Sequence, residues 1–385
     1  MFLRRLLYRI FLYTVLLIGT ALFLLPLVWL ISTSLKPIEQ TMSMPPTFIP
    51  YRNYAEIDGR NVAVRRAETI EMPSSIIVEE GADKMRIVPQ SMIRGNLLIQ
   101  ADADGEETQK PVTIVREIPA SREQPWVRVA PETERKPEQG EQMAEWHVVP
   151  AGAVTRRISP RWENYPGAIR AMKEFPSYLR NTVFLCIMTV IGTVLSSAVA
   201  AYGFARIQWR GRNKVFVLCL VTMMIVGPVT MVPIYCLFKA LGWIGTMRPL
   251  WVGSFCAGAF NVFLLRQFFL TIPKDLSEAA RIDGCSEFRI FWQIILPLCR
   301  PALMVVGLFQ FMGTWNDFFG PLIYLTDQKQ YTLALGLYAF QSQHGGTEWH
   351  WLMAASMLVV LPIIILFFFT QKTFIEGISM TGIKG

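Results

Sequence analysis

Residues 181–205 read NTVFLCIMTVIGTVLSSAVAAYGFA, a run of 25 positions without one charged side chain. A helix that crosses a lipid bilayer needs about 20 consecutive, mainly apolar residues. This run is long enough, and five further apolar runs resemble it, at 10–35, 215–238, 249–265, 296–325 and 349–371. The sequence therefore predicts an all-α polytopic membrane protein with six transmembrane helices.

Two of these runs depart from the pattern. The run at 249–265 is short, and it reaches a spanning length only when Phe268 and Phe269 are included. The run at 296–325 is interrupted by Arg300 and Asp317.

The first run follows Arg4, Arg5 and Arg9, as the core of a secretory signal peptide would. A signal-peptide core has about 7–15 apolar residues, whereas this run has 26. We therefore expect a retained transmembrane helix.

Composition agrees with a membrane protein. Of 385 residues, 52% are hydrophobic and 17% charged, and the mean hydropathy is +0.35. These values exclude a disordered chain, a coiled coil and an ordinary soluble enzyme domain. The net charge of +8 is unevenly placed, because residues 51–165 carry 16 Lys or Arg against 19 Asp or Glu. The excess of positive charge belongs to the apolar part, so it indicates membrane orientation and no nucleic-acid partner.

Lysine and arginine are concentrated in one set of short loops. With the N-terminus in the cytoplasm, the cytoplasmic segments hold 14 of them and the short outer loops hold only Lys239, Arg248 and Lys329. Because cytoplasmic loops are enriched in these residues, we expect both termini in the cytoplasm and residues 36–180 to be extracytoplasmic.

The segment 51–159 has the composition of a separate module. Short β-type runs separated by Pro, Gly and charged residues recur at 76–78, 96–99, 112–115, 126–129 and 146–149. We expect a small β-rich extracytoplasmic domain inserted between the first two helices, with 1–50 before it and a helical core, 160–385, after it. Similar flanks, Arg52-Asn53-Tyr54 and Trp162-Glu163-Asn164-Tyr165, suggest insertion into one ancestral loop.

Residues 273–297 predict a helix, a turn and a second helix. Asp275 and Glu278 have the spacing of a capping box, and Gly284 can end the first helix in a left-handed conformation. Phe288, Phe291 and Ile295 would share one apolar face of the second helix. That face could lie on the bilayer or dock into a cytoplasmic partner, and the residues alone favour neither.

The same segment carries a resemblance to a known family. Glu278-Ala279-Ala280-Arg281-Ile282-Asp283-Gly284 and the later Ile294-Ile295-Leu296-Pro297 resemble the EAA signature of ABC importer permeases. Five other motifs resemble the MalG-like carbohydrate permeases in particular: Ser34-Leu35-Lys36-Pro37, Trp162-Glu163-Asn164-Tyr165, Arg180-Asn181-Thr182, Trp315-Asn316-Asp317-Phe318 and Phe374-Ile375-Glu376-Gly377. The resemblance covers about 1–50 and 160–385, whereas family members usually have a short loop in place of 51–159.

The resemblance implies a subunit of a bacterial inner-membrane importer. Its partners would be a second, MalF-like permease, two ABC ATPase subunits beneath the membrane and an extracytoplasmic solute-binding protein. The cargo would be a carbohydrate, with an oligosaccharide as the first expectation. ATP-driven closure of the ATPases would move the hairpin and switch the pathway between inward- and outward-facing states.

Two sets of coupling residues follow from the resemblance. In the hairpin they are Glu278, Ala279, Ala280, Asp283 and Gly284. In the tail, 372–385, they are Gly382, Ile383, Lys384 and Gly385, which would reach between the ATPase subunits. The alternatives are a Glu278 that only caps its helix and a tail that is a frayed end.

Polar residues inside the apolar runs are candidates for the substrate pathway. Sugars need hydroxyl partners and stacking rings, so we expect the pathway to include Gln310, Trp315, Asn316 and Asn261. Ser196, Ser197 and Tyr202 are further candidates. The alternative is that such residues only join helices to one another.

Three other classes of function would require different sequence features. A permease for a polyamine or phosphonate-like solute would share the EAA hairpin, but the terminal Gly-Ile-Lys-Gly favours a carbohydrate. A sensor with an external ligand domain would need a cytoplasmic output domain, and only 14 residues follow Gln371. A membrane-embedded enzyme would need paired carboxylates within the runs. The sequence contains no P-loop, no metal-spaced His pair and no C-x-x-C, so we expect no catalytic residue, cofactor or metal.

Overall fold

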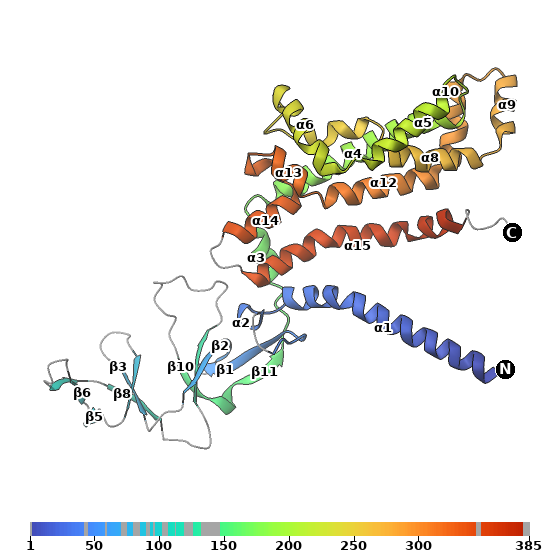
Figure 1. Ribbon diagram of the computed structural model, residues 1–385. Helices are drawn as coiled ribbons and strands as arrows, with labels where there is room; N and C mark the ends of the chain where they lie inside the picture. The colour runs from blue at the N-terminus through green and yellow to red at the C-terminus, as the bar shows by residue number, and fades with distance from the viewer. Residues whose placement is uncertain are drawn as a thin grey trace. The chain divides into compact units, whose positions relative to one another are not determined.

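The computed structural model describes residues 2–41, 45–57, 60–70, 75–79, 85–89, 93–94, 97–101, 107–111, 113–118, 126–131, 147–343 and 348–379. These residues fall into two compact units, Met1–Gly167 and Ala168–Gly385 (Figure 1).

The first unit begins with a long helix, α1 (Phe2–Ser34), followed by the short α2 (Ile38–Thr41). The apolar side chains of α1 are exposed on all sides of the helix, with Leu17 70% and Phe23 86% accessible. A helix that is hydrophobic all round needs an apolar surrounding, and a bilayer provides one. Pro26 lies within the helix, which membrane helices tolerate.

Antiparallel strands follow α2 in the same unit. The largest sheet has the order β10-β9-β2-β1-β11, and two three-stranded sheets have the orders β4-β3-β8 and β5-β6-β7. The strands are β1 (Tyr51–Ile57), β2 (Arg60–Ile70), β3 (Ser75–Glu79), β4 (Met85–Pro89), β5 (Ile93–Arg94), β6 (Leu97–Ala101), β7 (Glu107–Pro111), β8 (Thr113–Ile118), β9 (Trp126–Pro131), β10 (His147–Pro150) and β11 (Thr155–Ile158). In the largest sheet, Ala55, Ile57, Val64, Val127, Val129 and Val149 form a small buried core.

All five expected β-type runs overlap strands, namely β3, β6, β8, β9 and β10. The first residues of three of those runs, Asn96, Val112 and Trp146, lie outside the described residues. Strand β11 was not expected. Its four side chains are all exposed, so its sequence lacks the apolar alternation that marks a half-buried strand.

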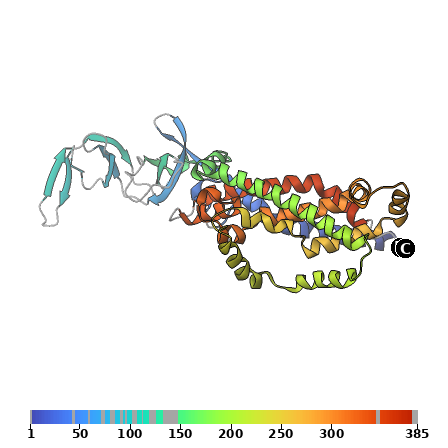
Figure 2. The same cartoon turned by 90° about the horizontal axis from the view of Figure 1, so that it is seen from above.

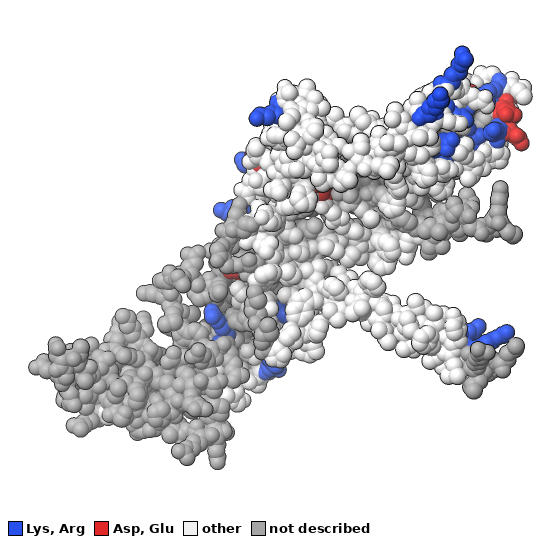
Figure 3. All heavy atoms as spheres, in the orientation of Figure 1, with Lys and Arg blue, Asp and Glu red and all other residues white. Residues whose placement is uncertain are grey.

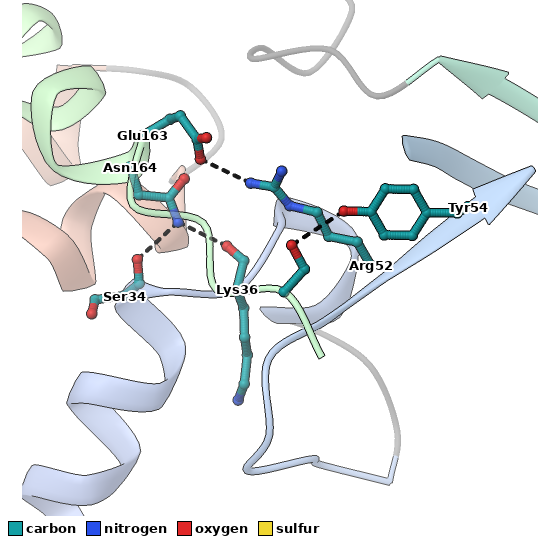
Figure 4. Close-up of polar contacts among 7 residues, drawn as sticks. Ser34, Lys36, Arg52, Tyr54, Glu163 and Asn164 are labelled. Atoms are coloured by element: carbon teal, nitrogen blue, oxygen red, sulfur yellow. Dashed lines mark hydrogen bonds and ion pairs between the residues drawn. The ribbon is translucent and has the colours of Figure 1, made fainter. Parts of the chain in front are cut away.

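The strand segment begins and ends at neighbouring positions. Tyr51 of β1 pairs with Ile158 of β11, and the Ser159 N–H donates to the Pro50 carbonyl at 3.3 Å. Tyr54 Oη donates to Ser159 Oγ at 3.2 Å (Figure 4). A chain that leaves and returns at one point is the geometry an inserted segment requires.

The two similar flanks meet at this point. The Asn164 side-chain amide donates to the carbonyls of Ser34 at 2.8 Å and Lys36 at 2.9 Å (Figure 4). Arg52 forms a 2.8 Å ion pair with Glu163. The flank after the strands is therefore held to the end of α1 by its own side chains.

Lys36 is fully buried beside these contacts. Its Nζ lies 4.1 Å from the centroid of the Trp29 ring and donates to Thr33 Oγ1 at 3.5 Å. Burial lowers the pKa of this ammonium group, and the ring face partly replaces the water it has lost.

The second unit is helical. Its elements are α4 (Phe175–Ala205), α5 (Arg212–Val221), η3 (Thr222–Met224), α6 (Gly227–Ala240), α7 (Arg248–Val252), η4 (Gly253–Phe255), α8 (Ala259–Thr271), α9 (Lys274–Ile282), α10 (Glu287–Ile290), η5 (Phe291–Ile295), α11 (Leu296–Leu298), α12 (Arg300–Trp315), α13 (Phe319–Tyr324), η6 (Gln328–Gln330), α14 (Leu333–Gln343) and α15 (Trp349–Ser379). Helix α3 (Asn164–Ala171) spans the boundary between the units.

Among the described residues, four helical segments are long and apolar enough to cross a membrane: Arg5–Ser34, Phe175–Ala205, Arg248–Thr271 and Trp349–Gln371. Two further helix pairs are apolar enough together but sharply bent, as in a broken span or a re-entrant loop. The pair of Arg212–Met224 and Gly227–Ala240 bends by 98° (Figure 2), and the pair of Glu287–Leu298 and Arg300–Trp315 bends by 79°. Counting each bent pair as one span gives six.

The run at 296–325, which Arg300 and Asp317 interrupt in the sequence, is divided among three helices. Helix α11 ends at Leu298, α12 covers Arg300–Trp315, and α13 begins only at Phe319. Pro297 and Pro301 lack the N–H groups that would continue the hydrogen-bond ladder, so the chain bends between them.

Helix α4 packs closely against its neighbours through small residues. An added Cβ on Gly192 would lie 2.6 Å from Ser254 Oγ and 2.7 Å from Phe255 Cδ2, so a larger residue there would force one of these side chains to shift. Nearer its C-terminal end, Ala198 and Ala201 are buried in a cluster with residues of α8, α12 and the 273–297 segment.

We expect Gly192→Ala to destabilise the protein, by about 1–3 kcal/mol, because overpacking a close contact forces its neighbours apart. Gly203→Ala is the matched control, since it lies on the same helix and meets nothing within 4 Å. Thermal unfolding in detergent, followed with a thiol-reactive dye, measures both. Equal melting temperatures for the two variants would contradict the close approach.

Candidate functional site

The hairpin of α9 and α10 turns at Gly284, as expected. Gly284 has φ = +79°, a conformation that favours glycine. The Cys285 N–H donates to Ala280 O at 2.9 Å and the Gly284 N–H to Arg281 O at 3.0 Å. These two bonds form a Schellman motif, which satisfies carbonyls at the end of α9.

The expected capping box is wrong. Helix α9 begins after Pro273, which makes no side-chain capping bond, and Asp275 lies within the first turn. The negative charge of Asp275 still favours this helix end through the helix dipole. Glu278 is exposed, so its carboxylate lies at the surface of the hairpin.

The expected apolar face of the second helix is partly wrong. Phe291 and Ile295 are buried, but Phe288 is 72% exposed. Residues Phe291–Ile295 form a π-helix, whose extra residue per turn rotates the following side chains. Phe288 instead stacks on Trp292, with ring centroids 6.3 Å apart and planes at 12°.

The EAA residues divide between two environments. Ala280 is 7% exposed and packs into the cluster shared with α4 and α8. Glu278, Ala279, Asp283 and Gly284 are exposed. Beside them the Ile282 side chain is 87% exposed. The hairpin therefore presents apolar and acidic groups together at its free surface, while its other face is fixed to the bundle.

Glu287 joins both helices of the hairpin to α4. Arg281 Nε donates to Glu287 Oε1 at 2.7 Å, and Tyr202 Oη donates to Glu287 Oε2 at 2.7 Å. The hydrogen bond to Glu287 raises the pKa of Arg281. The Tyr202 ring is buried and lies 5.0 Å from the Phe291 ring, centroid to centroid.

The sequence indicated neither that Tyr202 holds the hairpin nor that Glu287 does. Tyr202 was a candidate for the substrate pathway, and the structure places it against the hairpin instead. No sequence pattern marked Glu287 beyond its place in the second helix, because its partner Tyr202 lies 85 positions earlier in the chain.

A second contact fixes the beginning of the hairpin. Arg206, which follows α4, donates from Nη2 to the carbonyls of Phe269 and Ile272 at 2.6 Å each. These groups belong to the end of α8 and the residue after it, where helix carbonyls have no partner within the helix.

The expected pathway residues occupy different places. Gln310 donates to Thr314 Oγ1 at 3.1 Å, and Thr314 shares a 2.9 Å hydrogen bond with Thr189 of α4. Trp315 is buried and donates to the Val359 carbonyl of α15 at 3.0 Å.

The other two candidates lie at helix ends. Asn316 is exposed and its amide donates to the Met312 carbonyl at 2.9 Å, which caps the end of α12. Asn261 is half-buried in the first turn of α8, beside Gly258.

The tail residues Gly382, Ile383, Lys384 and Gly385 lie outside the described residues. Within the described ranges, no group of three His, Cys, Asp or Glu side chains could hold a metal ion.

Comparison with known proteins identifies relatives of this chain. The profile of the family described as "Binding-protein-dependent transport system inner membrane component" matches residues 180–379. The chain is 35% identical to the arabinooligosaccharides transport system permease protein AraQ of Bacillus subtilis, over 58% of this chain and 79% of AraQ. It is 32% identical to the trehalose/maltose transport system permease protein MalG of Thermococcus litoralis, over 58% of this chain and 81% of MalG.

A solved structure shares the fold. A chain in the crystal structure of a bacterial ABC transporter involved in the import of the acidic polysaccharide alginate matches with a TM-score of 0.52 and 23% identity. The match covers 56% of this chain and 80% of that one.

We expect Tyr202→Phe to loosen the hairpin while its ring still packs on Phe291. Loss of one hydrogen bond to a charged group corresponds to about 1.5 kcal/mol or more, so amide hydrogen exchange over 281–295 should accelerate about tenfold. Tyr235→Phe is the control, because Tyr235 stacks on Tyr324, far from the hairpin in the chain. Unchanged exchange in Tyr202→Phe would show that Glu287 is held by Arg281 alone.

Proposed function

The chain belongs to the family of binding-protein-dependent transport system inner membrane components, and we propose that it forms one half of the transmembrane pathway of an ATP-driven importer for a carbohydrate. The other half would be a second permease. Two ATPase subunits would lie beneath the pair, and ATP hydrolysis would belong to them. An oligosaccharide is the favoured cargo, because the named relatives include permeases of arabinooligosaccharides and of trehalose and maltose.

The observation that carries this proposal is the hairpin. Ile282 and Phe288 are exposed at its surface, whereas Ile290 and Ile295 on its inner side are fully buried. Exposed large apolar groups beside charges are typical of a docking surface. The fixed inner side means that a partner which moves the tip also moves α4, α8 and α12.

The coupling follows from that rigidity. The partner ATPases would close on ATP and carry the hairpin with them. Close-packed contacts transmit such a displacement because they do not deform continuously. ATP can shift the pathway between its two states only if the complex binds ATP more tightly in one of them. Glu278, Ala279, Asp283 and Gly284 would meet the ATPase, and Ala280 would hold α9 to the bundle.

The remaining sequence expectations complete the proposal. The chain would cross the inner membrane six times with both termini in the cytoplasm, and the tail 372–385 would reach the ATPases. Gln310 and Asn261 would line the substrate pathway, with Trp315 and Asn316 close to it. A non-sugar solute is less favoured by the named relatives. A sensor is less favoured, because a sensor would leave the exposed surface of the hairpin without a protein to dock on it.

The experiment that tests the proposal is purification of the tagged chain in mild detergent with identification of its partners. We expect an ATPase and a second permease with the wild type, and loss of the ATPase with Ile282→Asp, because a carboxylate there would be buried unpaired in the interface. Ile158→Asp is the matched control, since Ile158 is a comparably exposed isoleucine on β11. Recovery of the chain alone, even after cross-linking, would contradict the proposal.

We also propose that the strand segment contacts the solute-binding protein. Positive charge is concentrated in one sheet of this segment, although 51–165 as a whole carries slightly more acidic than basic residues. The strands of the five-stranded sheet carry seven Arg and two Glu: Arg52, Arg60, Arg65, Arg66, Arg128, Arg156, Arg157, Glu56 and Glu68. This sheet would meet an acidic face of the binding protein.

The exposed edge strand β11 supports that proposal. Arg156 lies 3.3 Å from the Tyr51 ring centroid and Arg157 lies 5.7 Å from that of Tyr54. A guanidinium held on a ring loses less side-chain freedom when it pairs with a carboxylate.

Pro50 and Ser159 lie side by side, because the Ser159 N–H donates to the Pro50 carbonyl. We therefore expect that 51–158 can be replaced by a short glycine linker and that the chain still binds the ATPase and the second permease. The deleted chain should lose stimulation of ATP hydrolysis by the binding protein. Arg156→Gln with Arg157→Gln should weaken the same stimulation in the intact chain. Full stimulation of an assembled complex after the deletion would rule out this role.

A further inference from the structure

The loop between α4 and α5 and the first turn of α5 line a pocket of about 500 Å³. The lining residues are Gln208, Trp209, Gly211, Arg212, Asn213 and Lys214. Two of them are cationic and none is acidic. The sequence has no Asp or Glu anywhere from 175 to 274, so this part of the chain supplies no carboxylate to the pocket.

Arg212 of the pocket and Arg266 of the neighbouring α8 each donate to a backbone carbonyl. Arg212 Nη1 donates to the Ile207 carbonyl at 3.3 Å, and the turn before it uses Gly211 at φ = +89°. Arg266 of α8 donates to the Phe204 carbonyl at 3.3 Å and lies 4.2 Å from the Phe216 ring centroid. Arg266 therefore adds a positive charge on α8 against α5, the helix that Arg212 begins. An anion in the pocket would be attracted by these positive charges.

The surroundings of the pocket are those of a membrane interface. Val217 and Leu218 of α5 are 58% and 64% exposed and continue directly from the cationic turn. Trp209 is 42% exposed and its indole N–H donates to the Gly203 carbonyl at 3.2 Å. Tryptophan with one polar and one apolar side is typical of the headgroup level of a bilayer.

The pocket lies at the same end of the helical unit as the hairpin. Arg206, at the start of the loop, bonds the carbonyl of Ile272, which directly precedes the hairpin. Blue side chains gather at this end of the unit in Figure 3, near α5 and α10. The membrane leaflet that meets the pocket is therefore the one on the hairpin side.

We propose that this pocket binds the phosphate group of an anionic phospholipid. Arg212 and Lys214 pair with the phosphate, Gln208 and Asn213 donate to headgroup oxygens, and the acyl chains lie along Val217 and Leu218. A lipid is preferred to free phosphate because the apolar face of α5 adjoins the cations and would otherwise play no part in binding.

The test measures lipid retention by the purified transporter complex in nanodiscs of phosphatidylcholine with a minor share of phosphatidylglycerol. Native mass spectrometry counts the phosphatidylglycerol that stays bound. We expect the preference for phosphatidylglycerol to fall about tenfold in Arg212→Gln with Lys214→Gln, because each cation strengthens the attraction to an anionic headgroup. Arg212→Lys with Lys214→Arg should retain it.

The matched control removes two other cations, Lys239 in the last turn of α6 and Arg248 at the start of α7, as Lys239→Gln with Arg248→Gln. It should retain the preference of the wild type. Equal losses in the two double variants would overturn the proposal, because they would reflect net charge alone. Displacement of the lipid by millimolar inorganic phosphate would assign the pocket to free phosphate instead. Loss of the ATPase from the Arg212→Gln, Lys214→Gln complex in pure phosphatidylcholine would assign the loop to the ATPase, which also overturns it.

Discussion

The hydrogen bond from Tyr202 to Glu287 joins two parts of the chain that have different surroundings. Tyr202 belongs to an apolar helix that needs a bilayer, and Glu287 belongs to a polar hairpin that needs water or a partner. The bond is charge-assisted and short, and the Tyr202 ring is buried against Phe291. Such bonds are stronger than those between neutral groups. This attachment, the Arg206 contacts and the buried cluster around Ala280 and Ile290 fix the hairpin to the helices.

Close packing extends the attachment into the bundle. Gly192, Ala198 and Ala201 bring α4 near its neighbours, and apolar residues of α8 and α12 complete the same cluster. In a membrane, lipid tails are as apolar as leucine, so helices associate through close contact of small residues more than through removal of water. A glycine at 192 therefore lets α4 approach Ser254 and Phe255 closely.

The contacts that hold the end of α1 come from outside the strand segment. Asn164 donates to the carbonyls of Ser34 and Lys36, and none of these three residues belongs to a strand. The β1–β11 pairing then brings both ends of the module to one place. The module and its attachment are separate features, because Asn164 and the residues it binds lie outside the strands.

The sequence by itself determined the membrane class, the approximate apolar segments, the β-type runs and the EAA hairpin with its turn at Gly284. These are local properties: the length of an uncharged run, alternation over a few residues, and a glycine where φ is positive. Only the tertiary structure decided that the apolar segments bend at 225–227 and 298–300, that Phe288 is exposed, and that Tyr202 faces Glu287. The physical reason is that prolines in an apolar run can be tolerated or can bend the chain, and the packing around them selects between the two. A contact between residues 85 positions apart depends on how helices pack, which no local pattern of side chains encodes.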